Sequence, residues 1–239
     1  HMKNFIKKKI RSILYFIELF FRLRVESKSP IDFYLDNLSL DCYKFFEKHM
    51  KNSSIFIKAD DIKRYSILKV LNNADKKNDL YLEFGVYTGN SINYFAKILS
   101  KKGLDINGFD SFEGLDEDWE TSEFFPAGTF SLNKKVPKTL SNVKIIKGRV
   151  QDTLENFITD KKNKKIGFIH MDMDTYGATK FALNKIKPLL NHGSVILFDN
   201  FYGFPNWQHH EYKALCEVFT QSEFKYIAFC ESQVAIEII

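Results

Sequence analysis

Acidic side chains follow two apolar runs in the second half of the chain. Asp172 and Asp174 stand two residues apart after the first run, and Asp199 with Asn200 follows the second. On an extended chain residues i and i+2 point the same way, so the carboxylates of the first pair repel each other unless a cation intervenes. Asp172, Asp199 and Asn200 offer the oxygen ligands that suit Mg²⁺. The sequence therefore predicts a magnesium site, with loop capping by these acids as the simpler alternative.

A glycine-containing segment earlier in the chain indicates a nucleoside ligand. In Leu80–Ser91 an apolar run ends in Glu83, Gly85 and Gly89 follow, and a helical pattern then begins. Glycines allow a sharp turn and a close approach of ligand to backbone, and a helix start offers unpaired N–H groups to an anionic ligand end. The E-x-G-x-x-x-G spacing differs from the G-x-G-x-x-G of dinucleotide sites. It favours a ligand with one nucleoside and a short polar tail, such as S-adenosylmethionine (SAM), although a simple turn would also explain it.

Polar residues at two further strand ends complete the predicted ligand site. Asp110 lies roughly twenty residues past the glycine segment, where an acid can accept hydrogen bonds from ribose hydroxyls. Gln151 and Asp152 follow another strand, where polar side chains could read the adenine edge, while Asp152 could instead cap the next helix. Both interpretations stay open. The predicted cofactor contacts are Glu83, Gly85, Gly89, Ser91, Asp110, Ser111, Gln151, Asp152 and Asp172.

Alternating strands and helices would bring these residues to one edge of a sheet. The sequence predicts strands at 80–84, 105–110, 143–147, 165–172, 194–199, 225–230 and 233–238, with helices over 90–100, 152–159, 175–190 and about 208–220. Such alternation is typical of a doubly wound α/β fold with a seven-stranded, mostly parallel sheet. The last two strands have no helix between them, so one strand is antiparallel. In open sheets of this kind, ligands bind at the carboxyl ends of the strands.

Composition limits the class of protein. The 239 residues, 44% hydrophobic and 27% charged, suit one globular domain with an additional helical segment. The net charge of +5 is modest, and no basic stripe with interleaved aromatics indicates nucleic acid. Three scattered cysteines show no metal or redox spacing, which is typical of reduced thiols in a cytoplasmic protein.

The first part of the chain is expected to be helical. Residues 3–25 combine apolar positions at helical spacing with many Lys and Arg side chains. This helix either lies on an anionic membrane surface or packs on another subunit or on its own core, and we favour packing and a homo-oligomer. Helices over 31–50 and 60–74 follow, the second capped by Asp60 or Asp61. We therefore expect a helical extension over 1–76 and a catalytic domain over 77–239, with the aromatic-rich segment 116–140 as a lid.

Several short motifs occur in order between residues 108 and 211. They are GFDSFEGL at 108–115, AGTFS at 127–131, DTL at 152–154, IHMDMD at 169–174, FD at 198–199, FP at 204–205 with Trp207, and HE at 210–211. On these motifs the chain resembles the macrocin O-methyltransferase-like family of SAM-dependent enzymes. The resemblance extends from about residue 81 to residue 239, and the helices before residue 80 lie outside it.

The resemblance implies a class I, Rossmann-like methyltransferase fold and a reaction. SAM would be the methyl donor, and a hydroxyl group, usually on a sugar or a related small molecule, would be methylated with the help of magnesium. By matching position, Asp172 and Asp199 would be metal ligands and Asp174 the general base. Better-understood members carry an acid after the second of these aspartates, where this chain has Asn200. The amide carries one negative charge fewer, which weakens the prediction of metal dependence.

Two other classes of function compete with this interpretation. A metal-dependent glycosyltransferase also holds its ion with an Asp-x-Asp pair after an apolar strand, but it leaves Gly85, Gly89 and Asp110 without a role. A non-catalytic, membrane-associated protein built on a methyltransferase fold would be consistent with the basic N-terminal helix and with Asn200.

Overall fold

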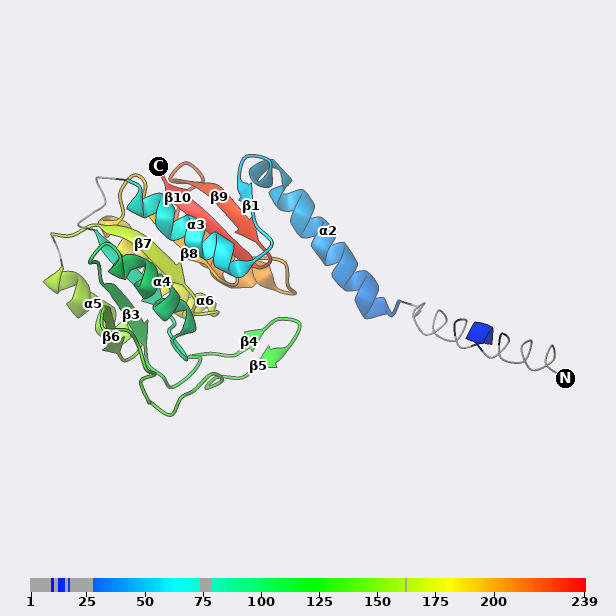
Figure 1. Cartoon of the computed structure of the whole chain (residues 1–239), viewed down its shortest axis with the longest axis horizontal. Coiled ribbons are helices and arrows are strands. Elements are labelled where there is room, and N and C mark those ends of the chain that lie inside the picture. The colour runs from blue at the N-terminus through cyan, green and yellow to red at the C-terminus, as the bar shows by residue number, and fades with distance from the viewer. Residues whose placement is uncertain (1–9, 11–12, 16, 18–27, 74–78, 162) are drawn as a thin grey trace. The chain divides into compact units, whose positions relative to one another are not determined.

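The computed structural model of the protein describes residues 10, 13–15, 17, 28–73, 79–161 and 163–239. The chain divides into two compact units, 1–37 and 38–239. Most of the helix predicted over 3–25 lies outside the described residues, and no described helix is both long and apolar enough to cross a membrane. The larger unit carries the sheet and all the predicted site residues (Figure 1).

The central element of the larger unit is an eight-stranded sheet. Its strands lie in the order β1-β9-β10-β8-β7-β2-β3-β6. Their bounds are β1 Ser54–Ile55, β2 Leu80–Phe84, β3 Ile106–Asp110, β6 Val143–Lys147, β7 Ile166–Met171, β8 Val195–Phe198, β9 Phe224–Cys230 and β10 Gln233–Ile238. Strand β10 runs antiparallel to both β8 and β9, and the other pairings are parallel. The predicted fold class is thus confirmed, with the short strand β1 as an eighth strand beside β9.

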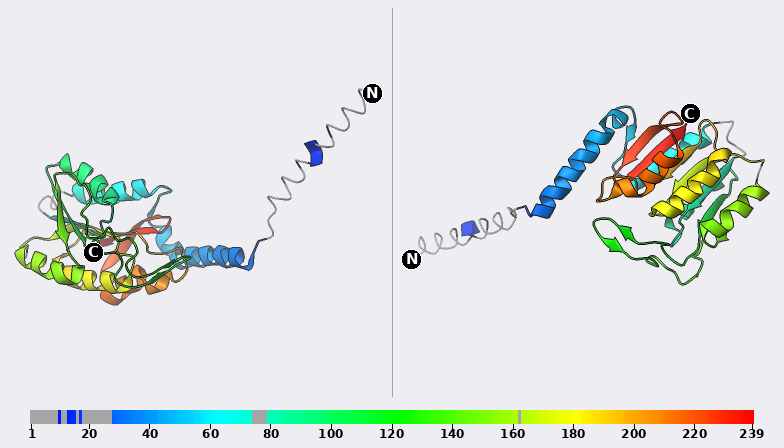
Figure 2. Two further views of the ribbon diagram at one scale, coloured as in Figure 1. Left: turned by 90° about the horizontal axis from the view of Figure 1, so that it is seen from below. Right: turned by 180° about the vertical axis from the view of Figure 1, so that it is seen from behind.

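Helices cover both faces of the sheet. Helices α3 (Ala59–Leu71) and α4 (Asn90–Ser100) lie on one face, and α5 (Val150–Asp160), α6 (Tyr176–Ile186) and α7 (Glu211–Val218) lie on the other (Figures 1 and 2). Strands β2 and β7 are buried along their whole length because both of their faces are covered. Two apolar clusters, one on each face, therefore hold the strand ends in fixed positions.

Local sequence explains why the helix after β2 begins and packs where it does. Gly89, with φ of 85°, precedes the first turn of α4 in the left-handed conformation that glycine adopts without strain. Ile92, Phe95, Ala96 and Leu99 follow at spacings of three and four residues and are all buried. This stripe fixes the helix against the sheet, so that the glycine segment lies at the carboxyl end of β2.

One helix start differs from its prediction. Helix α3 begins at Ala59, and its N-cap residue is Lys58, which makes no side-chain capping bond. Asp60 and Asp61 lie in the first turn instead, where carboxylates interact favourably with the helix dipole. The predicted capping role of Asp60 or Asp61 was therefore wrong.

Helix α2 (Pro30–Met50) begins with a reciprocal cap. The Asp32 carboxylate accepts the Ser29 N–H at 2.7 Å, while the Asp32 N–H donates to the Ser29 hydroxyl at 3.2 Å. Proline at the first helical position suits this arrangement because it has no N–H to satisfy. The Ser-Pro pair at which the preceding helical pattern ends therefore also starts the next helix.

Candidate active site

A cavity of about 310 Å³ lies at the carboxyl edge of the sheet. Its lining includes Gly85 after β2, Asp110 at the end of β3, Gly148 after β6, Asp172 after β7 and Asn200 beyond β8. This is the edge at which doubly wound sheets bind ligands. The alternation of elements therefore gathers residues that are far apart in the sequence around one opening.

The structure divides the predicted site residues into two groups. The residues that line the cavity are Gly85, Asp110, Ser111, Asp172, Asp174 and Asn200. Those outside its described lining are Glu83, Gly89, Ser91, Gln151, Asp152 and Asp199. Within the second group, Glu83 and Ser91 are hydrogen-bonded to each other, and Glu83 and Asp199 both contact His170.

Gly85 is required by a close approach of two strand ends. Its φ is 84°, and a Cβ atom at this position would lie 1.7 Å from the carbonyl oxygen of Asp172. Any other residue would therefore push the end of β7 away from the glycine segment. The Gly85 N–H donates to the Phe109 carbonyl at 3.0 Å and the Asp172 N–H to the Phe84 carbonyl at 2.8 Å, which ties three strand ends together.

Asp110 shapes the glycine segment from the neighbouring strand. Its Oδ2 accepts the N–H groups of Val86 and Tyr87 at 2.8 and 2.7 Å, and its Oδ1 accepts that of Phe112 at 2.6 Å. A carboxylate has about four lone-pair positions, so these three bonds leave about one position for a further donor. The predicted contact with both ribose hydroxyls stays a prediction, and it competes with this backbone role.

Glu83 is a buried support beneath the cavity. It is completely inaccessible, and it accepts hydrogen bonds from the Ser91 hydroxyl at 2.9 Å and from Nδ1 of His170 at 3.1 Å. Burial raises the pKa of Glu83, while His170 and Ser91 oppose this effect. Glu83 and Ser91 therefore connect the start of α4 to strand β7.

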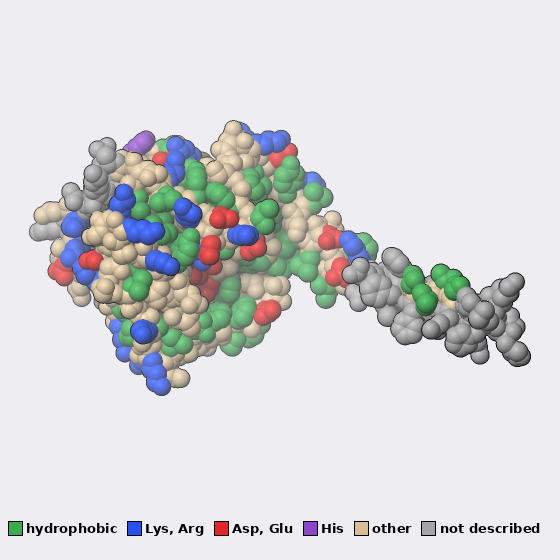
Figure 3. Space-filling view, viewed as in Figure 1, with side chains coloured by type: hydrophobic (Ala, Val, Ile, Leu, Met, Phe, Trp, Pro, Cys, Tyr) green, Lys and Arg blue, Asp and Glu red, His purple; other side chains and the backbone are tan. Residues whose placement is uncertain are grey.

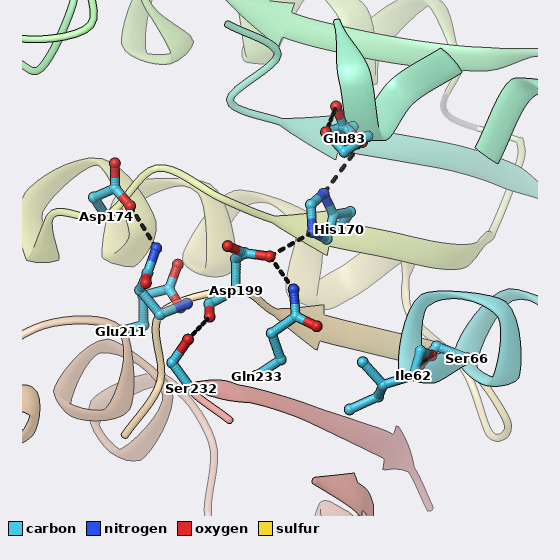
Figure 4. Close-up of polar contacts among 11 residues, drawn as sticks. Ile62, Ser66, Glu83, His170, Asp174, Asp199, Glu211, Ser232 and Gln233 are labelled. Atoms are coloured by element: carbon cyan, nitrogen blue, oxygen red, sulfur yellow. Dashed lines mark hydrogen bonds and ion pairs between the residues drawn. The ribbon is translucent and has the colours of Figure 1, made fainter. Parts of the chain in front are cut away.

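His170 links Glu83 to Asp199. In the sequence it stood out only as part of the motif IHMDMD. Its Nε2 lies 3.4 Å from Oδ1 of Asp199, which also accepts the Gln233 amide, and the chain of contacts is visible in Figure 4. Burial by itself would lower the pKa of His170, but the hydrogen bonds to Asp199 and Glu83 raise it to about 10. The two acidic neighbours therefore favour the imidazolium form of the ring, in which both nitrogens are hydrogen-bond donors.

Two carboxylates beside His170 could hold a metal ion, whereas an imidazolium has no lone pair to offer as a ligand. Ligand atoms of His170, Asp172 and Asp199 all lie within 4.8 Å of one another. Burial, followed by repulsion from Asp199, raises the pKa of Asp172 well above its usual range, whereas His170 lowers that of Asp199 against the effect of burial. A divalent cation would relieve the repulsion between these oxygen donors, so they fit Mg²⁺. Acidic side chains also gather near the centre of the face shown in Figure 3.

Asp174 lies in a tight turn rather than on an extended chain. Its φ is 62°, and the Thr175 N–H donates to the Met173 carbonyl at 2.6 Å across it. The prediction that Asp172 and Asp174 extend side by side was therefore wrong, because the chain reverses after β7. The Asp174 carboxylate instead accepts the Asn200 amide at 2.7 Å.

The surroundings of Asp174 raise the pKa of its carboxyl group into the range of a general base. Burial, followed by repulsion from Asp199, raises the pKa of Asp174 to about 7, while the hydrogen bond from Asn200 opposes this shift. Since Asn200 uses its amide N–H on Asp174, it acts here as a donor to the candidate base. An acid at position 200 could not make this contact when ionised.

Glu211 is a second residue whose role the sequence did not reveal. It is fully buried at the start of α7, and its Oε2 accepts the Asn200 N–H at 3.1 Å, while Oε1 has no hydrogen-bond partner in the described part of the chain. Burial, followed by repulsion from Asp174, raises the pKa of Glu211 well above its usual range. The side chain fixes the backbone that carries Asn200, and only its place in the HE motif pointed to it.

Gln151 and Asp152 lie in the first turn of α5, whose N-cap residue is Arg149. The Gln151 amide donates to Asp116 at 3.0 Å, and Arg149 contacts the other oxygen of Asp116 at 2.7 Å. Recognition of an adenine edge by Gln151 stays a prediction. In the structure the Gln151 amide is held against residue 116, at the start of the segment predicted to form a lid.

The predicted lid, residues 116–140, is largely irregular but carries the hairpin β4 (Trp119–Glu120) and β5 (Phe124–Phe125). The Glu117 carboxylate accepts the N–H of Gly177 in the first turn of α6 at 2.8 Å. His210 contacts the Glu120 carbonyl at 3.1 Å through Nε2. The segment is thus fastened to elements that follow both β7 and β8.

The fold and the site together define a class I methyltransferase architecture: a mostly parallel sheet with one antiparallel strand and a glycine segment beside a cavity at its carboxyl edge. Residues 82–201 match the family model described as a methyltransferase domain, and the chain belongs to this family.

Solved structures with the same fold include two O-methyltransferases. CalS11, described as a calicheamicin methyltransferase and as a TDP-rhamnose 3'-O-methyltransferase, is 18% identical, with 89% of this chain and 94% of that chain covered and a TM-score of 0.60. The O-methyltransferase NovP is 17% identical, with 75% and 78% covered and a TM-score of 0.55. No curated protein matches the chain.

Proposed function

We propose that the protein is a SAM-dependent O-methyltransferase that methylates a hydroxyl group of a sugar or a related small molecule. The observation that carries this proposal is that two sets of residues line one and the same cavity. Gly85, Asp110 and Ser111 lie where the nucleoside and the polar tail of SAM are expected, and Asp174 and Asn200 line the same space. The names of CalS11 and NovP support transfer to oxygen, and that of CalS11 supports a sugar acceptor.

In the proposed reaction the acceptor oxygen forms a bond to the methyl carbon as the bond from that carbon to the SAM sulfur breaks. The products are the methyl ether and S-adenosylhomocysteine (SAH). The hydroxyl proton passes to the carboxylate of Asp174, which lines the cavity and is oriented by the Asn200 amide. Fixing both reactants in one cavity supplies much of the rate gain because reaction then needs no further loss of orientational freedom.

A divalent cation would be held by Asp172 and Asp199, with Asn200 as a weaker candidate because its amide already contacts Asp174. When bound, such an ion lowers the pKa of a hydroxyl group and orients it. In the protein itself, His170 and Gln233 hold the Asp199 carboxylate in place, so the donor atoms are positioned before any ion arrives.

Metal binding should stabilise the folded protein, and this effect can be measured without an activity assay. We expect Mg²⁺ to raise the midpoint of thermal unfolding by about 2–4 °C for each kcal/mol of binding free energy. Asp172→Asn should abolish the increase because it removes a charged ligand. The control is Asp105→Asn, which changes an exposed acid paired with Lys144 before β3. An equal Mg²⁺ effect in all three proteins would exclude a site at Asp172.

The proposed function can be tested against its main rival with two ligands. We expect SAH to raise the unfolding midpoint by several degrees and UDP-glucose to leave it unchanged, since ligands stabilise only the state to which they bind. Transfer of labelled methyl groups from SAM to a panel of glycosides then tests the reaction. Stabilisation by UDP-glucose without SAH binding would favour a glycosyltransferase instead.

The segment 116–140 is proposed to close over the donor and the acceptor. Its support is the pair of contacts that Glu117 and Glu120 make beyond the segment, to Gly177 and His210. Trp119 and Phe130 from this segment line the cavity. Closure of such a segment excludes water from the reacting groups.

A further inference from the structure

A row of aromatic rings runs from the glycine segment along the lid. The ring centroids of Tyr87 and Phe130 are 5.6 Å apart, those of Phe130 and Phe125 are 5.6 Å apart, and those of Phe125 and Trp119 are 5.1 Å apart. Tyr87, Phe130 and Trp119 of this aromatic row line the cavity. Tyr87 and Phe130 are 45% and 37% exposed, so their rings are open to a ligand.

The far end of the row lies on the acceptor side of the cavity. The Trp119 ring meets those of Phe204 and His210 at centroid distances of 6.1 and 6.4 Å. Both partners lie on the connection from β8 to α7, which also carries Asn200. The row therefore extends beyond the residues expected to hold SAM and reaches the region of the candidate base.

At the ends of strands β7 and β8 the cavity is lined by polar side chains and not by aromatic rings. Asp174, Thr175 and Asn200 line it there with a carboxylate, a hydroxyl and an amide. A pyranose ring matches such a pair of surfaces, because its C–H groups form an apolar face while its hydroxyl groups project from the edge. Aromatic rings have an electron-rich face that attracts C–H groups of partial positive charge. A planar phenol has few edge hydroxyls, and an acyclic polyol has no flat face.

Charge further limits the acceptor. Among the described residues that line the cavity, Arg149 is the one Lys or Arg side chain. It is already paired with Asp116 at 2.7 Å and with Glu113 at 3.4 Å. Even beside one divalent cation, a diphosphate would need further cationic or N–H donors to offset Asp116, Asp172 and Asp174, which line the same cavity. This lining therefore suits an uncharged glycoside better than a nucleotide-linked sugar.

We propose that the acceptor is an uncharged pyranoside whose apolar face stacks on the aromatic row, with Phe130 as a specificity-determining residue. This inference rests on the proposed function, because it assigns the acceptor of that same site. The ring lies with one face against Phe130 and presents a hydroxyl group to Asp174.

The test is saturation-transfer NMR and titration on the full chain with SAH and Mg²⁺ present. The probes are a panel of methyl hexopyranosides, with sorbitol, catechol and UDP-glucose as competitors of other classes. We expect the pyranosides to bind best, and Phe130→Ala to weaken their binding by about tenfold or more. Phe130→Tyr should retain binding because it keeps the ring. The matched control is Phe124→Ala, on the same lid but 61% exposed and outside the described cavity lining.

SAH binding distinguishes a wrong acceptor from a wrong function. If SAH stabilises the wild type and every variant equally, any loss of pyranoside binding in Phe130→Ala reports on the acceptor site and not on folding. Unchanged pyranoside binding in Phe130→Ala, no pyranoside binding, or tighter binding of UDP-glucose, catechol or sorbitol would overturn the acceptor assignment alone. Failure of SAH to bind the wild type would overturn the proposed function itself.

Discussion

Replacing Asp174 with Asn should lower the rate of methyl transfer within a single turnover by about a hundredfold to ten-thousandfold, the usual contribution of a general base. The substitution keeps the shape of the side chain and an oxygen that can still accept the Asn200 amide. It removes the group that takes the acceptor proton. The left-handed backbone of residue 174 also tolerates Asn, which adopts this conformation more readily than most residues.

The measurement is single-turnover methyl transfer together with SAH affinity. We expect SAH to bind Asp174→Asn as it binds the wild type, so that the defect lies in chemistry. Asp105→Asn, at an exposed position before β3, serves as the matched control and should retain full turnover. Full turnover in Asp174→Asn with normal SAH binding would show that another group accepts the proton.

Replacing His170 with Phe should destabilise the protein by about 3–5 kcal/mol, the cost typical of removing one partner of a buried ion pair. The ring is completely buried between the carboxylates of Glu83 and Asp199. Without the imidazolium, Glu83 keeps only the Ser91 hydroxyl as a described hydrogen-bond partner. Phe has a ring of similar size, so the loss reports on charge and hydrogen bonding more than on volume.

Chemical denaturation with a second substitution distinguishes these causes. Glu83→Gln combined with His170→Phe removes both buried charges, so we expect the double variant to recover part of the stability that His170→Phe loses. Asp172 is not substituted in this series, so Mg²⁺ binding can be compared in all variants. Additive losses in the double variant would mean that Glu83 and His170 are not energetically coupled.

The positions of the strands along the chain could be predicted from the sequence because their signals are local. Residues 80–84, 143–147 and 233–238 combine apolar runs with nearby turn signals, and the structure has strands there with the same bounds. The one antiparallel strand followed from the missing helix between the last two strands. The short strand β1 was not predicted, since Ser54 and Ile55 carry no periodic pattern and depend on pairing with β9.

The contacts within the site were harder to predict because they depend on strand register. Glu83 and His170 lie opposite each other on β2 and β7, which are adjacent in the sheet although 87 positions separate the two residues. A histidine within a fully buried strand was the available signal, because a buried polar group needs a partner. The sequence alone did not identify that partner. The reversal at Asp174 was likewise hidden, since Asp-x-Asp does not specify a positive φ.

The contact between Glu117 and the first turn of α6 has a kinetic consequence. The N-cap residue Thr175 makes no side-chain capping bond, so Glu117 supplies the described side-chain contact to the Gly177 N–H. If the segment 116–140 opens to release the product, as proposed, the Gly177 N–H must exchange the Glu117 carboxylate for water. We therefore expect escape of the methylated product, more than the methyl transfer itself, to limit the steady-state rate, with a burst of product in the first turnover as its signature.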